Sequence, residues 1–282
     1  MDSSFKELFI LAKENLRIIL IITFITSSVG VVYALIATPI YKSELYMIST
    51  DENRDGILGG GIEGLASQFG LGGALDMSNS ESIYNKRVAL KILSSREFSL
   101  NFLYANNYMG FIFPEKWDSS KKTWRKDVSI PNHELIMKNI NETRIIAEDL
   151  KSGVILYSLE SPYPEFATEF LNKSIKELNR KIREMSKEDG IRKIAYLEEE
   201  ISKTNLVQAQ TVLAAILKDE KQNLMIANTR EDFAFKVIDK AIVPKQKFKP
   251  SRRVIAISSF FFGILISMFY IIYLNSRVDE NH

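Results

Sequence analysis

Cysteine is absent from this 282-residue chain, and histidine occurs only twice, as His133 and His282. The missing thiols exclude disulfides, cysteine-ligated zinc, iron–sulfur clusters and cysteine nucleophiles. Two histidines so far apart argue against an imidazole-rich metal site, and a Ser/His/Asp triad would have to rest on His133. We therefore expect no metal and no cofactor.

An excess of charge of either sign is also missing. The chain has 37 Lys and Arg against 35 Asp and Glu, a net charge of +2. This balance argues against a nucleic-acid-binding protein. No Gly-x-x-x-x-Gly-Lys-[Ser/Thr] pattern occurs, which excludes a fused P-loop kinase. Gly59, Gly61 and Gly64 match a dinucleotide-binding spacing, but they do not directly follow a predicted strand, so we interpret their glycine-rich run as a loop.

Two long stretches have no charged residue, from Ile18 to Tyr41 and from Val254 to Ser276. Each is long enough to cross a hydrocarbon core of about 30 Å as a helix. We predict membrane helices over 18–38 and 254–274, short tails at 1–17 and 275–282, and a large loop over 39–253. A cleaved signal peptide is disfavoured for the first stretch, because its apolar core is long and acidic residues precede it. Both tails are expected on one side of the membrane and the whole loop on the other.

Charge counting leaves the orientation open. The first tail has three basic residues, and the loop has five just before the second helix (Lys245, Lys247, Lys249, Arg252 and Arg253). The positive-inside rule would place that loop in the cytoplasm, but long domains are translocated largely regardless of charge.

Small residues recur at four-residue spacing in both predicted membrane helices: Thr26, Gly30 and Ala34 in the first, and Ser259, Gly263 and Ser267 in the second. Such ridges let helix backbones approach closely in lipid. Two interpretations stay open: the helices pack on each other or on neighbouring copies, or the spacing arises by chance.

The loop is predicted to be an α+β domain with a long helical arm. Residues 41–49 alternate as a strand does, 80–93 and 131–140 favour helices, and 143–147 with 153–159 favour a strand pair turning at 151–153. The aromatic-rich segment 96–124 has two interpretations, which are core packing and exposed rings that stack on sugars.

The long helices are predicted over about 162–230. Ser161 suits a helix N-cap with Pro162 at the first helical position. Asp189-Gly190 is expected to break the helix, and 191–230 then continues without Gly or Pro for about 60 Å. Its apolar stripe has to pack on the preceding helix or on a neighbouring subunit. Residues 232–243 are predicted to return to the membrane as a strand that ends at Pro244.

Four segments, in this order, resemble the polysaccharide co-polymerase family, also called the Wzz or chain-length determinant family. Pro39-Ile40-Tyr41-Lys42-Ser43 is similar to its first strand, and Gly64-Leu65-Ala66-Ser67 to its glycine-rich segment. Ser161-Pro162 with Ala167 resembles its strand-to-helix step. The segment before the second membrane helix resembles its proline-rich signature through Ala241, Pro244, Pro250 and Arg252, with Lys247 where the signature usually has a proline.

The resemblance implies a homo-oligomer, a closed ring in the inner membrane of Gram-negative bacteria, with the loop in the periplasm and both termini in the cytoplasm. It implies an α/β base with long helices, no catalytic site, and control of the modal length of O-antigen in lipopolysaccharide biosynthesis. The implied partners are a membrane polymerase and the growing polysaccharide. The alternative within the family is capsule or exopolysaccharide export with an outer-membrane channel.

The sequence disfavours two other classes of function. A two-helix sensor is disfavoured because the expected tails are short. An enzyme is disfavoured because the charged runs 198–200 and 219–221 suit a solvated helix face better than an acid–base pair.

The linker between Pro244 and Pro250 is predicted to be semi-rigid, because proline restricts its own backbone and that of the residue before it. Its basic residues suit contact with membrane lipid phosphates, and a simple solvated spacer is the open alternative.

Overall fold

A computed structural model describes Lys13, residues 15–50 and residues 86–279. The chain divides into two compact units. The terminal unit takes both ends of the chain, up to Tyr41 and from Lys245 onward, and the central unit runs from Lys42 to Pro244. The glycine-rich run and residues 80–85 of a predicted helix lie outside the described residues.

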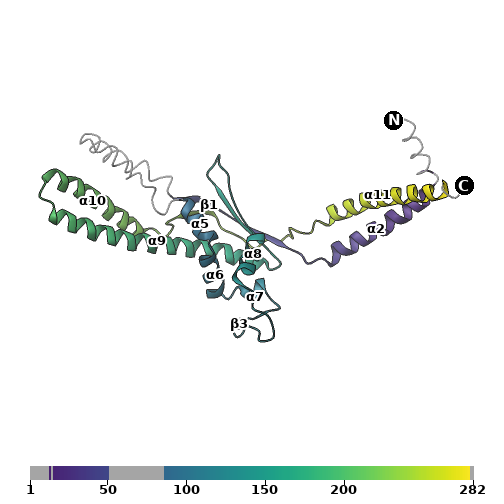
Figure 1. The fold of residues 1–282 in the computed structure, drawn as a ribbon, viewed down its shortest axis with the longest axis horizontal. Helices are drawn as coiled ribbons and strands as arrows, with labels where there is room; N and C mark the ends of the chain where they lie inside the picture. Colours follow the sequence, from purple (N-terminus) through teal and green to yellow (C-terminus); the bar gives the residue numbers. More distant parts are fainter. Residues whose placement is uncertain (1–12, 14, 51–85, 280–282) are drawn as a thin grey trace. The chain divides into compact units, whose positions relative to one another are not determined.

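The terminal unit is a pair of apolar helices, α2 (Leu16–Ile36) and α11 (Arg252–Asp279), which lie side by side (Figure 1). Both are long and apolar enough to cross a membrane. Their outer faces expose large apolar side chains such as Phe24 and Phe269. Exposure of these side chains is unfavourable in water and favourable in a lipid bilayer. The helices overlap the predicted spans 18–38 and 254–274, with bounds that differ by a few residues at the ends.

A four-stranded sheet organises the central unit, in the order β4-β5-β1-β6. The strands are β1 (Tyr41–Ser49), β4 (Arg144–Glu148), β5 (Ile155–Ser161) and β6 (Phe235–Asp239). The predictions of β1 and of the β4–β5 hairpin are confirmed. Gly153 adopts φ 67° in the hairpin turn, a conformation that glycine reaches without strain. The returning strand β6 is shorter than the predicted 232–243.

Short helices and a small hairpin complete the base of the central unit. They are α5 (Lys86–Ser94), α6 (Arg96–Ala105), α7 (Met109–Ile112), β2 (Trp117–Asp118), β3 (Thr123–Trp124) and α8 (His133–Thr143). The aromatic segment packs mainly into the core: Phe98, Phe102, Tyr108 and Trp117 are buried. The Phe102 ring meets Phe170 edge-on with centroids 5.3 Å apart. The structure therefore favours core packing over sugar stacking for these rings.

The arm is a hairpin of two helices, α9 (Pro164–Lys203) and α10 (Val207–Thr229), which pack side by side (Figure 1). The predicted break at Asp189-Gly190 is wrong, because α9 continues through it for a total of 40 residues. A glycine inside a helix costs only about 1 kcal/mol, which tertiary packing readily offsets. The chain turns instead at residues 204–206, in the polar stretch that interrupts the apolar stripe. The predicted continuous helix over 191–230 is therefore also wrong: residues 191–203 belong to α9 and residues 207–229 to α10, and the two helices pack on each other.

The start of α9 also differs from the prediction. Ser161 is the last residue of β5, and Pro164 occupies the first turn of the helix. Tyr163 precedes it with an extended backbone at φ −110° and ψ 97°. A residue before proline is pushed out of the helical region, so the second proline of the Ser161–Pro164 segment sets the boundary, not Pro162.

Replacing Gly190 with alanine is expected to stabilise the arm. An added Cβ would lie 3.5 Å from the Glu220 carboxylate and 3.7 Å from Leu224, which are ordinary contacts. We expect Gly190→Ala to raise the free energy of unfolding by about 0.5–1 kcal/mol, because alanine loses less backbone entropy on folding. Urea unfolding of the purified chain, followed by circular dichroism, measures this. Ala195→Gly, at an exposed position of α9, is the matched control and should shift stability in the opposite direction. A loss of stability in Gly190→Ala would contradict this account.

Candidate functional site: the strand return and the paired apolar helices

Two asparagines on α9 hold the chain as it returns toward the terminal unit. The Asn179 side-chain oxygen accepts hydrogen bonds from the backbone N–H of Ala234 (3.0 Å) and Phe235 (2.9 Å), and its amide donates to the Phe235 carbonyl (2.8 Å). Asn172, two turns earlier, accepts from the N–H of Ala241 (3.1 Å) and donates to the carbonyl of Ala241 (2.9 Å). The backbone groups of Ala241 therefore pair with a side chain instead of a strand, and β6 ends before it.

Sequence reasoning missed both asparagines. One signal was available in the sequence. Asn172 and Asn179 are seven residues apart, and the same spacing on α9 separates buried apolar residues such as Ile175 and Ile182. Asn179 is itself buried, and a buried amide requires hydrogen-bond partners. Its partners come from a strand more than 50 residues away, which the local pattern does not indicate.

The first and last motif segments of the predicted resemblance meet next to the apolar helices. Ile40 forms an isolated antiparallel bridge with Lys249: the Ile40 N–H donates to the Lys249 carbonyl (2.9 Å), and the Ile40 carbonyl accepts from Lys249 (3.1 Å). Pro39 and Tyr41 flank Ile40, Pro250 follows Lys249, and Arg252 begins α11. The bridge thus ties the end of the first apolar helix to the start of the second.

The remaining motif residues are not brought to this bridge. Pro162 lies between β5 and α9, and Ala241 is buried against α9 in the central unit. Pro244 is the last residue of the central unit, and Lys247 lies half-buried in the linker that follows.

Four of the small residues predicted to pack in the membrane make close contacts between α2 and α11. A Cβ added to Gly30 would lie 2.5 Å from the Cβ of Ser259. A Cβ added to Gly263 would overlap the Thr26 hydroxyl and approach the Thr23 Cα to 3.0 Å. Ala34 and Ser267 are buried. Residues later in α2 contact residues earlier in α11, so the two helices are antiparallel. The end of α2 and the start of α11 therefore lie at the same end of the helix pair.

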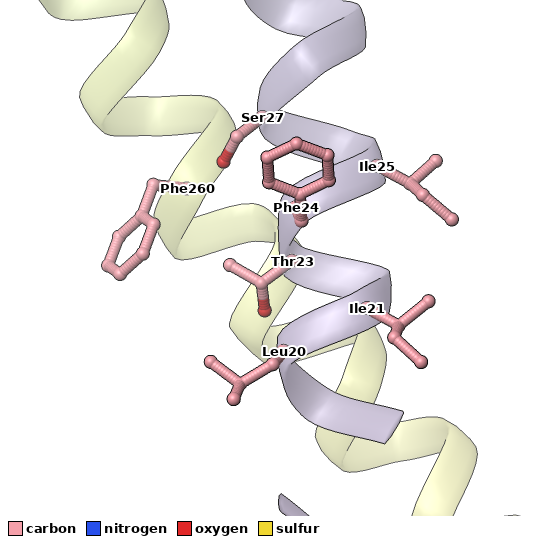
Figure 2. Close-up of a pocket in the computed structure, with 7 residues that line it drawn as sticks. All are labelled: Leu20, Ile21, Thr23, Phe24, Ile25, Ser27 and Phe260. Carbon is pink, nitrogen blue, oxygen red and sulfur yellow. The ribbon is translucent and has the colours of Figure 1, made fainter. Parts of the chain in front are cut away.

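A groove of about 560 Å³ runs beside this contact, and Figure 2 shows its lining. The lining is apolar apart from two hydroxyls: Leu20, Ile21, Thr23, Phe24, Ile25, Ser27 and Phe260. The Thr23 and Ser27 hydroxyls have no hydrogen-bond partner among the described residues. The groove therefore suits hydrocarbon, as a helix pair in a bilayer requires.

The buried polar groups of the base serve packing. Arg144 is buried and donates to the Leu93 carbonyl (3.1 Å) and the Asn141 side chain (2.8 Å). Burial raises the pKa of the Tyr157 phenol, against the opposing effect of Arg144. This tyrosine therefore stays neutral and accepts a hydrogen bond from the Ser174 hydroxyl at 3.2 Å.

Charged residues of the arm form ion pairs both within α9 and between α9 and α10. Lys221 contacts Glu198 at 2.7 Å, and Lys193 lies 3.2 Å from Asp189 and 3.8 Å from Glu220. These pairs fit a solvated helix–helix seam. No cluster of three or more potential metal ligands occurs in the part of the chain that the structure describes.

One protein-family model matches part of the chain. Residues 3–106 match the family model described as Wzz, chain length determinant protein. A comparison with curated proteins found no match. One similar solved structure is a full-length bacterial polysaccharide co-polymerase, at 11% identity and a TM-score of 0.42, covering 97% of this chain and 98% of its own. Another is a fragment of WzzB, a polysaccharide co-polymerase from Salmonella Typhimurium, at 15% identity and a TM-score of 0.31, covering 75% of this chain and 100% of its own.

The family match contains two of the four motif segments, Pro39–Ser43 and Gly64–Ser67, while the segments around Pro162 and Pro250 lie outside it. The resemblance predicted from the motifs is thus confirmed over residues 3–106, where the chain is similar to the chain length determinant family.

Proposed function

We propose that this protein is a non-enzymatic regulator of polysaccharide chain length that acts on a membrane polymerase and sets the modal length of O-antigen. The match of residues 3–106 to the chain length determinant family carries the proposal. The regulator would work by contact with the polymerase and the growing polysaccharide, without turnover of its own.

The antiparallel pair of apolar helices supports a specific topology. Because α2 and α11 are antiparallel, we place the central unit that connects them on one side of the membrane and both tails on the other. We place the central unit in the periplasm and the tails in the cytoplasm, with α2 and α11 in the bacterial inner membrane. This is the side on which surface polysaccharide would meet the arm.

Exposed apolar side chains on the arm support a homo-oligomer. Leu206 and Val207 at the turn are 73% and 75% exposed, and Ile191, Tyr196 and Met225 also expose much of their surface. A single copy leaves this surface in water, whereas a closed ring of copies would cover part of it. We propose such a ring as the working form.

A deletion strain tests the proposed function. We expect loss of the gene to replace a modal cluster of surface polysaccharide lengths by a smoothly decaying distribution on a gel, and restoration of the gene to bring the cluster back. The length cluster depends on the regulator, whereas polymer synthesis depends on the polymerase, so total polymer should persist.

Two outcomes would contradict the proposal. An unchanged length distribution with polymer lost from the cell surface would assign the protein to capsule or exopolysaccharide export with an outer-membrane channel. Polysaccharide that is unchanged in both length and amount would separate the protein from this process altogether.

A further inference from the structure

A patch of positive charge surrounds the point where α11 begins. Five basic residues fall within nine positions: Lys245, Lys247, Lys249, Arg252 and Arg253. No Asp or Glu occurs between Asp239 and Asp279, nor between Glu14 and Glu44 on the segment that ends at the bridge. The terminal unit therefore supplies no carboxylate along the described segments next to this patch.

Four of these cations have no ionic partner in the described structure. No ion pair joins Lys245, Lys247, Arg252 or Arg253 to another residue that the structure describes. Lys245, Arg252 and Arg253 are exposed, and Lys247 is half-buried. Elsewhere in the chain, lysines and arginines commonly pair with carboxylates, as Lys193 and Arg180 do on α9. Among the described residues, no carboxylate therefore compensates the charge of these four cations.

The start of α11 adds to this field. The first turn of a helix has unpaired backbone N–H groups and the positive end of the helix dipole, so basic side chains there are unfavourable unless an anion is near. Arg252 and Arg253 are the first two residues of α11. This arrangement favours a negatively charged group from outside the chain.

The patch also lies at the boundary of the apolar helices. Val254 follows it directly and is exposed, and Phe248 within it is 46% exposed with the Lys249 ammonium 5.1 Å from its ring centre. The bridge from Ile40 to Lys249 holds this segment against the end of α2. Aromatic and basic side chains together at the end of a membrane helix typify the headgroup region of a bilayer.

We propose that Lys245, Lys247, Arg252 and Arg253 form a binding site for the phosphate groups of anionic phospholipids. The site anchors the junction between the central unit and α11 at the membrane surface. Lipid binding at this site is expected on whichever side of the membrane the central unit lies. It does not require that the protein control polysaccharide chain length.

Lipid selectivity of the purified full-length chain in nanodiscs tests the site. Electron spin resonance of spin-labelled lipids measures the association of phosphatidylglycerol relative to phosphatidylcholine. We expect a severalfold preference for phosphatidylglycerol. The preference should fall toward equality at about 0.5 M salt, because salt screens surface charges. The preference should fall to equality in the fourfold variant Lys245→Gln, Lys247→Gln, Arg252→Gln, Arg253→Gln, since each cation near an anionic surface contributes attraction.

A matched variant separates the site from bulk charge. Arg96, Arg125, Lys126 and Lys218 are also two lysines and two arginines, all exposed and all in the central unit. Their replacement by glutamine changes the net charge by the same amount and should leave the lipid preference unchanged. The pair Lys245→Arg, Lys247→Arg should also retain it.

Three results would overturn the proposal. They are a wild-type chain with no preference for phosphatidylglycerol, a fourfold variant that keeps the preference, and a control variant that loses it equally. A further experiment adds glycerol phosphate in solution. If glycerol phosphate at low concentration abolishes the association of phosphatidylglycerol, the site binds a soluble phosphate instead of a lipid. If the fourfold variant fails to insert, the salt dependence of the wild-type chain still decides. Gel profiles of polysaccharide report separately on the proposed function.

Discussion

Replacing Gly263 with leucine is expected to force α2 and α11 apart. Even a Cβ at this position would overlap the Thr26 hydroxyl and lie 3.0 Å from the Thr23 Cα, which is backbone and cannot rotate away. The Thr26 hydroxyl itself donates hydrogen bonds to the Ile22 and Thr23 carbonyls, at 3.0 Å each. Overpacking of a close contact typically costs about 1–3 kcal/mol, and helix pairs in lipid depend on such close approach.

The absence of cysteine makes this measurable in the full-length chain. Spin labels on Ile21→Cys and Phe269→Cys occupy exposed positions of the two helices, near the same depth by the antiparallel pairing. Double electron–electron resonance, with labelled chain diluted into unlabelled chain, should show one narrow distance that lengthens and broadens in Gly263→Leu. Phe262→Leu, at the adjacent exposed position, should leave the distance unchanged. An unaltered distance in Gly263→Leu would mean that the helices do not pack through this glycine.

Replacing Asn179 with alanine is expected to release the returning strand from α9. The change removes three hydrogen bonds at once and leaves the N–H groups of Ala234 and Phe235 and the Phe235 carbonyl without this partner. Because the site is buried, we expect the free energy of unfolding to fall by about 2–4 kcal/mol. Asn172→Ala should cost less, about 1 kcal/mol, since Asn172 makes two bonds and is only half-buried.

Urea unfolding of the purified chain, monitored by circular dichroism, measures both changes. Lys176→Ala, at an exposed position of α9 between the two asparagines, is the control. It should change the free energy of unfolding by less than about 0.5 kcal/mol. Equal effects of Asn179→Ala and Lys176→Ala would show that the side-chain bonds to the strand contribute nothing to stability.

Local patterns predicted the elements whose structure depends on local chemistry. The alternation of residues 41–49 indicates a half-buried strand, and β1 spans the same residues with alternate side chains buried. The hairpin of β4 and β5 turns at Gly153, a residue suited to its positive φ. The two apolar helices follow from uncharged stretches that no soluble loop would contain.

The same patterns misplaced the boundaries of the arm. Gly190 suggested a break because glycine is a poor helix former, yet α9 passes through it since packing against α10 outweighs a cost of about 1 kcal/mol. Pro162 suggested the start of the helix, but Pro164 lies two residues further and restricts Tyr163 to an extended backbone. The first error arose because long-range packing outweighed a local signal, and the second because two local proline signals competed.

By itself, the sequence determined that the chain has two apolar helices with an α+β unit between them, and that it resembles a family of chain length determinants. Only the tertiary structure decided which groups meet: Asn179 with the backbone of Phe235, Gly263 with Thr26, and Ile40 with Lys249. Composition and periodicity indicate which face of each segment is apolar, because that pattern depends on the residues of the segment alone. A contact between segments depends on the register of two surfaces, and that register is set by the packing of the whole unit.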